Sequence, residues 1–343
     1  MLAQTQKGVA LITALIFTVL VTSFAVAIAS QQQIDIRRTG NILAVERAYL
    51  LSQGIEDWAG NILEQDINGP SGNTHDHPLE DWNTELPPIE IEGAVISGKI
   101  TDLQGLININ GLVDSSGAQN PVEVDRFRRL LDLLGHNTDL VDAVIDWIDP
   151  DTATTNPAGA EDSTYLSKEP AYRTANAPMT SISELRLVEG FTNEVYTELR
   201  PFLTALPPST IATPLSPPPG PGGPTATPLS TPINMNTAPV EVIQAALGDG
   251  ITPLDENLAD EFQTNVETEE GYETEAEILD DNVVMGAGKT SPDFGPFGAA
   301  FSSEYFLIEA RAVLPDAQIQ LFSVVQRDTS GNLTVLMRGQ GSY

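Results

Sequence analysis

The chain lacks cysteine, so disulfide bridges, thiolate metal sites and cysteine nucleophiles are all excluded. Positive charge is scarce as well, because 16 Lys and Arg stand against 48 Asp and Glu, for a formal net charge of -32. Nucleic acids are held by clustered cations, so this balance argues against a nucleic-acid partner. With only three histidines, a three-histidine zinc site would have to use His75, His77 and His136 together. The sequence has no nucleophile-elbow, Walker or dinucleotide-binding motif, and paired carboxylates are too common here to indicate a hydrolase.

What the 343 residues do contain is a long apolar run near the N-terminus. Residues 9–29 are mostly apolar, and no charged residue occurs between Lys7 and Asp35. A helix needs roughly 20 apolar residues to cross the hydrocarbon core of a bilayer. We therefore predict a transmembrane helix over residues 9–30.

Three interpretations of this segment compete. It could be a cleaved secretory signal, with the small residues at 25–29 supplying the cleavage site and a mature start near Ser30. It could be a plain signal anchor. It could also follow a leader that is removed while the helix is kept, since Lys7 and Gly8 directly precede the apolar run. Arginines follow the span, and the positive-inside rule alone would place the rest of the chain in the cytoplasm.

The remainder reads as helices and strands in an α+β arrangement. Alternation at 94–100, 304–313, 319–327 and 333–338 predicts strands of one antiparallel sheet. Helical patterns at 122–134, 138–147 and 193–203 predict an all-helical block over 101–206. Residues 207–232 hold ten prolines and predict an extended linker.

A short motif occurs twice in the chain. Residues 107–110 read Ile-Asn-Ile-Asn and precede a helix beginning at Pro121, while residues 233–236 read Ile-Asn-Met-Asn and precede one near Pro239. We interpret Asn108 and Asn110 as turn or cap residues rather than ligands.

The main candidate for a chemical site is an acidic loop. Asp149 and Asp151 stand at the predicted end of a helix, and Glu161 and Asp162 follow a small polar stretch. Calcium takes six to eight oxygen ligands from carboxylates and loop carbonyls, and Asn176 could add one more. Spacing alone leaves a solvated acidic loop as an equal alternative. The acids at 267–277 are expected to form a solvated face or loop.

The chain resembles the minor pseudopilin K family of bacterial type II secretion. The resemblance rests on Lys7-Gly8 before the apolar helix, on Thr13 where most pilin-like subunits carry glutamate, and on residues 146–165. That stretch is similar to the family signature Asp-Trp-Ile-Asp-x-Asp…Gly-Ala-Glu-Asp-x-x-Tyr. The resemblance implies cleavage between Gly8 and Val9 by the prepilin peptidase and N-methylation of the new terminus. It also implies a bound calcium, for which the candidate ligands are Asp149, Asp151, Glu161 and Asp162.

The fold implied by the resemblance is a pilin-like long N-terminal helix packed on an antiparallel sheet, with an inserted all-helical domain. The expected domains are a prepilin leader (1–8), a transmembrane helix (9–30), the pilin-like helix and first strands (31–100), the inserted α-domain with the acidic metal loop (101–206), a Pro-rich linker (207–232), and the second Asn repeat, its helix and the C-terminal sheet (233–343).

The implied function is mechanical rather than enzymatic. A single-pass protein of the bacterial inner membrane, with its bulk in the periplasm, would join other minor pseudopilins at the tip of a pseudopilus. There it would support the export of folded proteins across the outer membrane. The alternatives are a membrane-anchored or exported acidic binding or hydrolytic protein, and a minor pilin of a type IV pilus.

Overall fold

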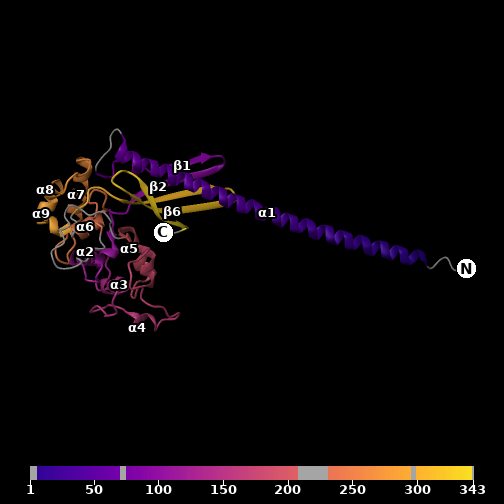
Figure 1. Cartoon of the computed structure of the whole chain (residues 1–343), viewed down its shortest axis with the longest axis horizontal. Helices are drawn as coiled ribbons and strands as arrows, with labels where there is room; N and C mark the ends of the chain where they lie inside the picture. Colours follow the sequence, from indigo (N-terminus) through magenta and orange to yellow (C-terminus); the bar gives the residue numbers. More distant parts are fainter. Residues whose placement is uncertain (1–5, 70–74, 208–230, 295–298, 342–343) are drawn as a thin grey trace.

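The computed structural model describes residues 6–69, 75–207, 231–294 and 299–341. One long helix extends away from the molecule, its C-terminal part lies on a β-sheet, and the other helices gather at the end far from the N-terminus (Figure 1). Most of the predicted leader and most of the predicted Pro-rich linker lie outside the described residues, although Gln6 to Gly8 already belong to the long helix.

The α-helices are α1 (Gln6–Asn68), α2 (Pro121–Leu133), α3 (Leu140–Ile148), α4 (Asp162–Tyr165), α5 (Asn193–Leu199), α6 (Val240–Leu247), α7 (Glu256–Thr268), α8 (Glu275–Asp280) and α9 (Asn282–Gly286). The strands are β1 (Leu86–Ile91), β2 (Ala94–Asp102), β3 (Ile107–Asn108), β4 (Leu203–Thr204), β5 (Tyr305–Leu314), β6 (Ala317–Arg327) and β7 (Leu333–Gln340). Short 3₁₀ turns are η1 (Asp81–Asn83), η2 (Ile109–Leu112), η3 (Ile182–Leu187), η4 (Arg200–Phe202) and η5 (Ser291–Phe294).

Helix α1 is continuous over 63 residues, which corresponds to roughly 95 Å at 1.5 Å per residue. Its side chains from Val9 to Leu43 are exposed, and the helix is long and apolar enough to cross a membrane. The hydroxyls of Thr13 and Thr18 donate to carbonyls one turn back, at 3.1 Å and 2.8 Å, so they need no partner outside the helix. The predicted membrane helix is therefore the exposed first half of a much longer element.

The C-terminal half of α1 packs on a five-stranded sheet in the order β1-β2-β5-β6-β7, in which every neighbouring pair is antiparallel. Leu63 of α1 shares a core cluster with Phe306 of β5 and Val325 of β6. The helix crosses close above β2, where a Cβ added at Gly98 would lie 2.6 Å from a methyl of Ile55. Two strands precede the helical domain in sequence and three follow it, which confirms the predicted sheet.

The helical domain has one core, and both copies of the repeated motif contribute to it. Ile107 and Phe127 from the first part belong to the same cluster as Val242, Phe262 and Val283 from the second. This core runs from residue 107 to residue 299, so the expected boundary at 206 falls inside it and the expected segment 233–343 is divided between the helical core and the sheet. The physical reason is that amphipathic helices of the two parts bury apolar faces against one another, as α2 and α6 do.

The first asparagine of each copy acts as a turn residue, as predicted for Asn108, whereas Asn110 does not. The side chain of Asn108 accepts the backbone N–H of Asn110 at 3.2 Å, and Asn234 accepts that of Asn236 at 3.1 Å. The second asparagine of each copy then bonds the backbone of a distant residue, Met179 in the first copy and Tyr272 in the second.

One local prediction differs from the structure, and one strand has no counterpart among the predictions. The predicted helix 193–203 ends at Leu199, because Pro201 has no N–H to continue the helical ladder. Strand β1 was not predicted, since Pro87 and Pro88 interrupt it, but it is an edge strand, where proline is tolerated. The segment after residue 250 is helical, and the acids predicted to form a solvated face there are largely exposed.

Candidate metal centre

The acidic loop begins where α3 ends. Asp149 is the C-cap residue of α3, and its N–H donates to the carbonyl of Ile145 at 2.9 Å. Pro150 follows it. The far end of the loop is α4, which is held beside α3 by an edge-on contact of Trp147 with Tyr165 at 5.3 Å between ring centroids. The two ends of the loop are therefore brought together by apolar packing.

Asp146, in the last turn of α3, organises the middle of the loop. Its buried carboxylate accepts the backbone N–H of Thr155 at 2.9 Å and 3.2 Å. Gly159 approaches the same carboxylate so closely that an added Cβ would lie 2.3 Å from Oδ2 of Asp146 and 2.4 Å from the carbonyl of Thr155. No side chain fits at position 159 unless the loop backbone moves.

Gly159→Ala is accordingly expected to lower the free energy of unfolding by about 1–3 kcal/mol, the usual cost of forcing extra atoms into a packed site. The measurement is thermal or denaturant unfolding of the full-length protein in detergent. Gly54→Ala in α1 is the matched control, because an added Cβ there meets nothing within 4 Å, and it should be neutral or slightly stabilising. Equal stability of both variants would show that the loop does not hold this conformation.

Three of the four predicted ligands converge. Ligand oxygens of Asp149, Asp151 and Glu161 all lie within 4.8 Å of one another. Asp149 and Glu161 are buried, at 3% and 4% exposure, whereas Asp151 is exposed. Asn176 is fastened to the same loop, since its Nδ2 donates to the carbonyl of Asp151 at 2.8 Å.

Three oxygens of this set are buried without a hydrogen-bond partner, namely Oδ1 of Asp149, Oε1 of Glu161 and Oδ1 of Asn176. A buried polar atom without a partner is costly, and it is tolerated where a ligand completes the site. These unpaired oxygens are acceptors only. They can bind a cation, whereas they would repel an anion or another hydrogen-bond acceptor.

The electrostatics of the site also favour a bound cation. Burial raises the pKa of Asp149 to about 6, with further contributions from the charges of Asp151 and Asp146. Burial raises the pKa of Glu161 to about 7, again with like-charge repulsion from Asp146 and Asp149. The carboxylates thus repel one another unless a positive charge joins them.

The donor set fits a hard cation such as calcium. It consists of carboxylate and amide oxygens on a curled loop, and carbonyls of the same loop are close by. The structure does not place Asp162 with this set, because its carboxylate contacts Arg173 at 3.0 Å and the N–H and hydroxyl of Thr174 at 3.1 Å and 3.0 Å. Asp162 occupies the first position of α4, and its carboxylate binds the segment at residues 173–174 instead.

The three-histidine zinc alternative is not supported. His75 and His77 stack with ring centroids 5.2 Å apart, but His136 lies in the helical domain and contacts Glu198 at 2.9 Å. Among the described residues, neither cluster with metal-ligand geometry contains a histidine.

Comparison with known proteins gives concordant results. A family model described as "Type II secretion system (T2SS), protein K" matches residues 105–208. The chain is 32% identical over 344 residues to type II secretion system protein K of Pseudomonas aeruginosa, covering 98% of this chain and 93% of that protein. It is 26% identical over 348 residues to the protein of that name from Klebsiella pneumoniae, covering 98% and 97%. Among solved structures, a chain of the GspK-GspI-GspJ complex from the enterotoxigenic Escherichia coli type 2 secretion system is similar with a TM-score of 0.70 at 20% identity, covering 89% of this chain and 100% of that one.

Proposed function

Because this chain belongs to the type II secretion system protein K family, we propose that it is a minor pseudopilin at the tip of a periplasmic pseudopilus. The proposed role is mechanical and non-enzymatic, and it supports the export of folded proteins across the outer membrane. The observation that carries the proposal is the combination, in one chain of this family, of a long exposed apolar helix with a bulky helical domain at its opposite end (Figure 1).

A tip position is supported by Thr13. A carboxylate at this depth in the membrane would need a cationic partner, whereas the hydroxyl of Thr13 is satisfied by the carbonyls of Val9 and Ala10 at 3.1 Å and 3.0 Å. A subunit with nothing above it requires no such partner. The helical domain adds bulk where a further subunit would otherwise stack.

The proposed partners are other minor pseudopilins. The similar solved chain comes from a complex with GspI and GspJ, which supports partners of this kind here. Association would begin in the inner membrane, where helices pack through close contact of small residues such as Ala25 and Ala29. The proposed topology is a single pass, with the sheet and helical domain in the periplasm.

Processing by the prepilin peptidase gives the sharpest test. The mature protein isolated from its native cell is expected to begin at Val9, N-methylated, and mass spectrometry of the intact chain measures this. Gly8→Val should leave the first eight residues attached and abolish export of the secreted proteins. Gly40→Val, on an open face of the same helix, should be processed normally. A mature start near Ser30 would exclude the proposal.

We also propose that the acidic loop binds calcium through Asp149, Asp151, Glu161 and Asn176. The unpartnered buried oxygens support this, because a divalent cation would satisfy several of them at once. Bound calcium would hold together the loop that joins α3 and α4.

A further inference from the structure

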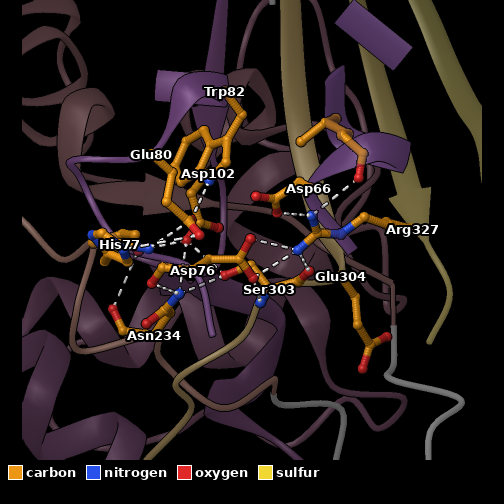
Figure 2. A network of polar contacts seen from close by, with 12 residues as sticks. Asp66, Asp76, His77, Glu80, Trp82, Asp102, Asn234, Ser303, Glu304 and Arg327 are labelled. Atoms are coloured by element: carbon orange, nitrogen blue, oxygen red, sulfur yellow. Dashed lines mark hydrogen bonds and ion pairs between the residues drawn. The ribbon is translucent and has the colours of Figure 1, made fainter. Parts of the chain in front are cut away.

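A second group of buried charges lies where the pilin-like body, which we define as α1 and the five-stranded sheet, meets the helical domain (Figure 2). At its centre is Arg327, the last residue of β6, whose side chain is 3% exposed. The guanidinium contacts Asp66 in the last turn of α1 at 2.7 Å and both carboxylate oxygens of Asp76. It also stacks over the ring of Phe306, 4.7 Å from the ring centroid.

Glu80 completes the acidic side of this group. Its carboxylate accepts the indole N–H of Trp82 at 2.6 Å and the backbone N–H of His77 at 3.0 Å. One carboxylate oxygen from each of Asp66, Asp76 and Glu80 lies within 4.8 Å of the other two. Three carboxylates therefore share one site, and two of them, Asp66 and Asp76, contact the guanidinium directly.

A fourth carboxylate, Asp102 at the end of β2, connects this group to the helical domain. Its Oδ2 accepts the hydroxyls of Ser303 at 2.6 Å and Thr237 at 2.5 Å, and the side-chain amide of Asn234 at 3.3 Å. Asn234 also donates to the carbonyl of Asp76 at 3.3 Å. Because Asn234 and Thr237 lead into α6 while the other residues belong to the body, these bonds are part of the seam between the two.

We define the junction as Arg327 together with Asp66, Asp76, Glu80 and Asp102. The other charged or titratable groups near it are His75 and His77 from the loop after α1, and Glu270, which follows α7. Glu304, which precedes β5, directs its carboxylate away from the junction, toward Gln326 (Figure 2). Burial lowers the pKa of His77, whose Nε2 lies 3.9 Å from a carboxylate oxygen of Glu80. Within the described part of the chain, Arg327 is the one arginine or lysine at the junction, where Asp76, Glu80 and Asp102 are buried and Asp66 is partly buried.

Such a group cannot be fully ionised in the folded state. Isolated buried charges cost several kcal/mol each, and one guanidinium compensates at most one or two carboxylates. When like charges share a buried site, the site keeps a proton instead.

We propose that the junction is a pH-sensitive lock between the helical domain and the body. While the two are packed together, its carboxylates share at least one proton. Loss of that proton weakens the packing of the helical domain on the body. The device is independent of the calcium loop, since the two sites have no residue in common. It is also independent of the proposed position at the pseudopilus tip.

The direction of the pH dependence follows from the carboxylates. Burial, together with the charges of Glu80 and Asp76, raises the pKa of Asp66 to about 7. Burial raises the pKa of Asp102 to about 6, although hydrogen bonds from Ser303 and Thr237 oppose the shift. An unfolded carboxyl has lost its proton above about pH 4. The stabilisation is therefore complete below about pH 4 and is lost as the pH rises through the folded values of about 6 and 7.

Hydrogen exchange of the full-length protein in detergent, at constant saturating calcium, tests this. After correction for intrinsic exchange, protection of peptides covering 75–82 and 231–237 is expected to fall by about tenfold or more between pH 5.5 and 8.5, since one pKa unit corresponds to tenfold. Protection of helix α2, which lies away from the junction, should change much less. Constant protection of the junction peptides over this range would overturn the proposal.

Two variants test whether Asp66 contributes to the pH dependence of the junction. Asp66→Asn keeps an oxygen that accepts from Arg327 but carries no titrating charge, so it should flatten the pH profile of the junction peptides. Glu64→Gln, an exposed change on the same turn of α1, should keep the wild-type profile. A wild-type profile in Asp66→Asn would also overturn the proposal, and if that variant does not fold, the wild-type measurement alone decides.

Discussion

Replacing Arg327 with methionine is expected to lower the free energy of unfolding by about 3–5 kcal/mol. Removing one partner of a buried ion pair costs this much, because the remaining charge is left in a medium that cannot solvate it. Here the loss leaves Asp66 and Asp76 without their shared cation and removes the contact with Phe306. Urea unfolding of the full-length protein in detergent measures the effect.

A control variant and a double variant separate the effect of losing the buried charge from the effect of losing side-chain bulk. Arg311→Met on β5 removes an exposed arginine and should stay within about 0.5 kcal/mol of wild type. Adding Asp66→Asn to Arg327→Met should recover part of the loss, since it removes one of the stranded charges. The cost of Arg327→Met should also be smaller at pH 5 than at pH 8, because protons replace the missing cation. A loss equal to that of Arg311→Met would show that the buried contacts contribute little.

The junction was not predicted from the sequence, and the reason is distance along the chain. Arg327 lies 261 residues from Asp66 and 251 from Asp76, so no local pattern connects them. The one available signal was an arginine that ends an otherwise apolar alternating strand. Such a residue is ordinarily read as a solvated strand end, and only the path of the chain brings α1 and the loop after it to that end.

The elements set by local periodicity were predicted well. The apolar run of α1 and the alternation of β2, β5, β6 and β7 follow directly from which faces must be buried. The joining of the two helical parts into one core was missed, because composition marks the Pro-rich segment between them as a linker. A linker says nothing about whether the segments on either side pack together.

The acidic loop lies between these cases. The sequence identified the stretch, and the structure brings Asp149, Asp151 and Glu161 together. It could not distinguish Glu161 from its neighbour Asp162, because the start of α4 turns adjacent side chains to different sides. One carboxylate points into the loop and the other to Arg173 and Thr174.

Calcium is expected to stabilise the full-length protein, by about 2.7 kcal/mol at a free concentration one hundred times the dissociation constant. The ion would bind the folded loop and not the unfolded chain, so the thermal midpoint should rise with calcium and fall with a chelator. Differential scanning calorimetry in detergent, with calcium or with chelator, measures the shift.

Asp149→Asn should reverse the order of stability between the two conditions. With chelator present, the variant should be at least as stable as wild type, because a buried charge facing Asp151 and Glu161 is gone. With calcium, it should be less stable than wild type, because a ligand charge is missing. Asp162→Asn should keep a calcium response close to that of wild type, since its carboxylate is directed to Arg173. Identical melting curves of wild type in calcium and in chelator would mean that the unpaired oxygens of the loop bind no such ion.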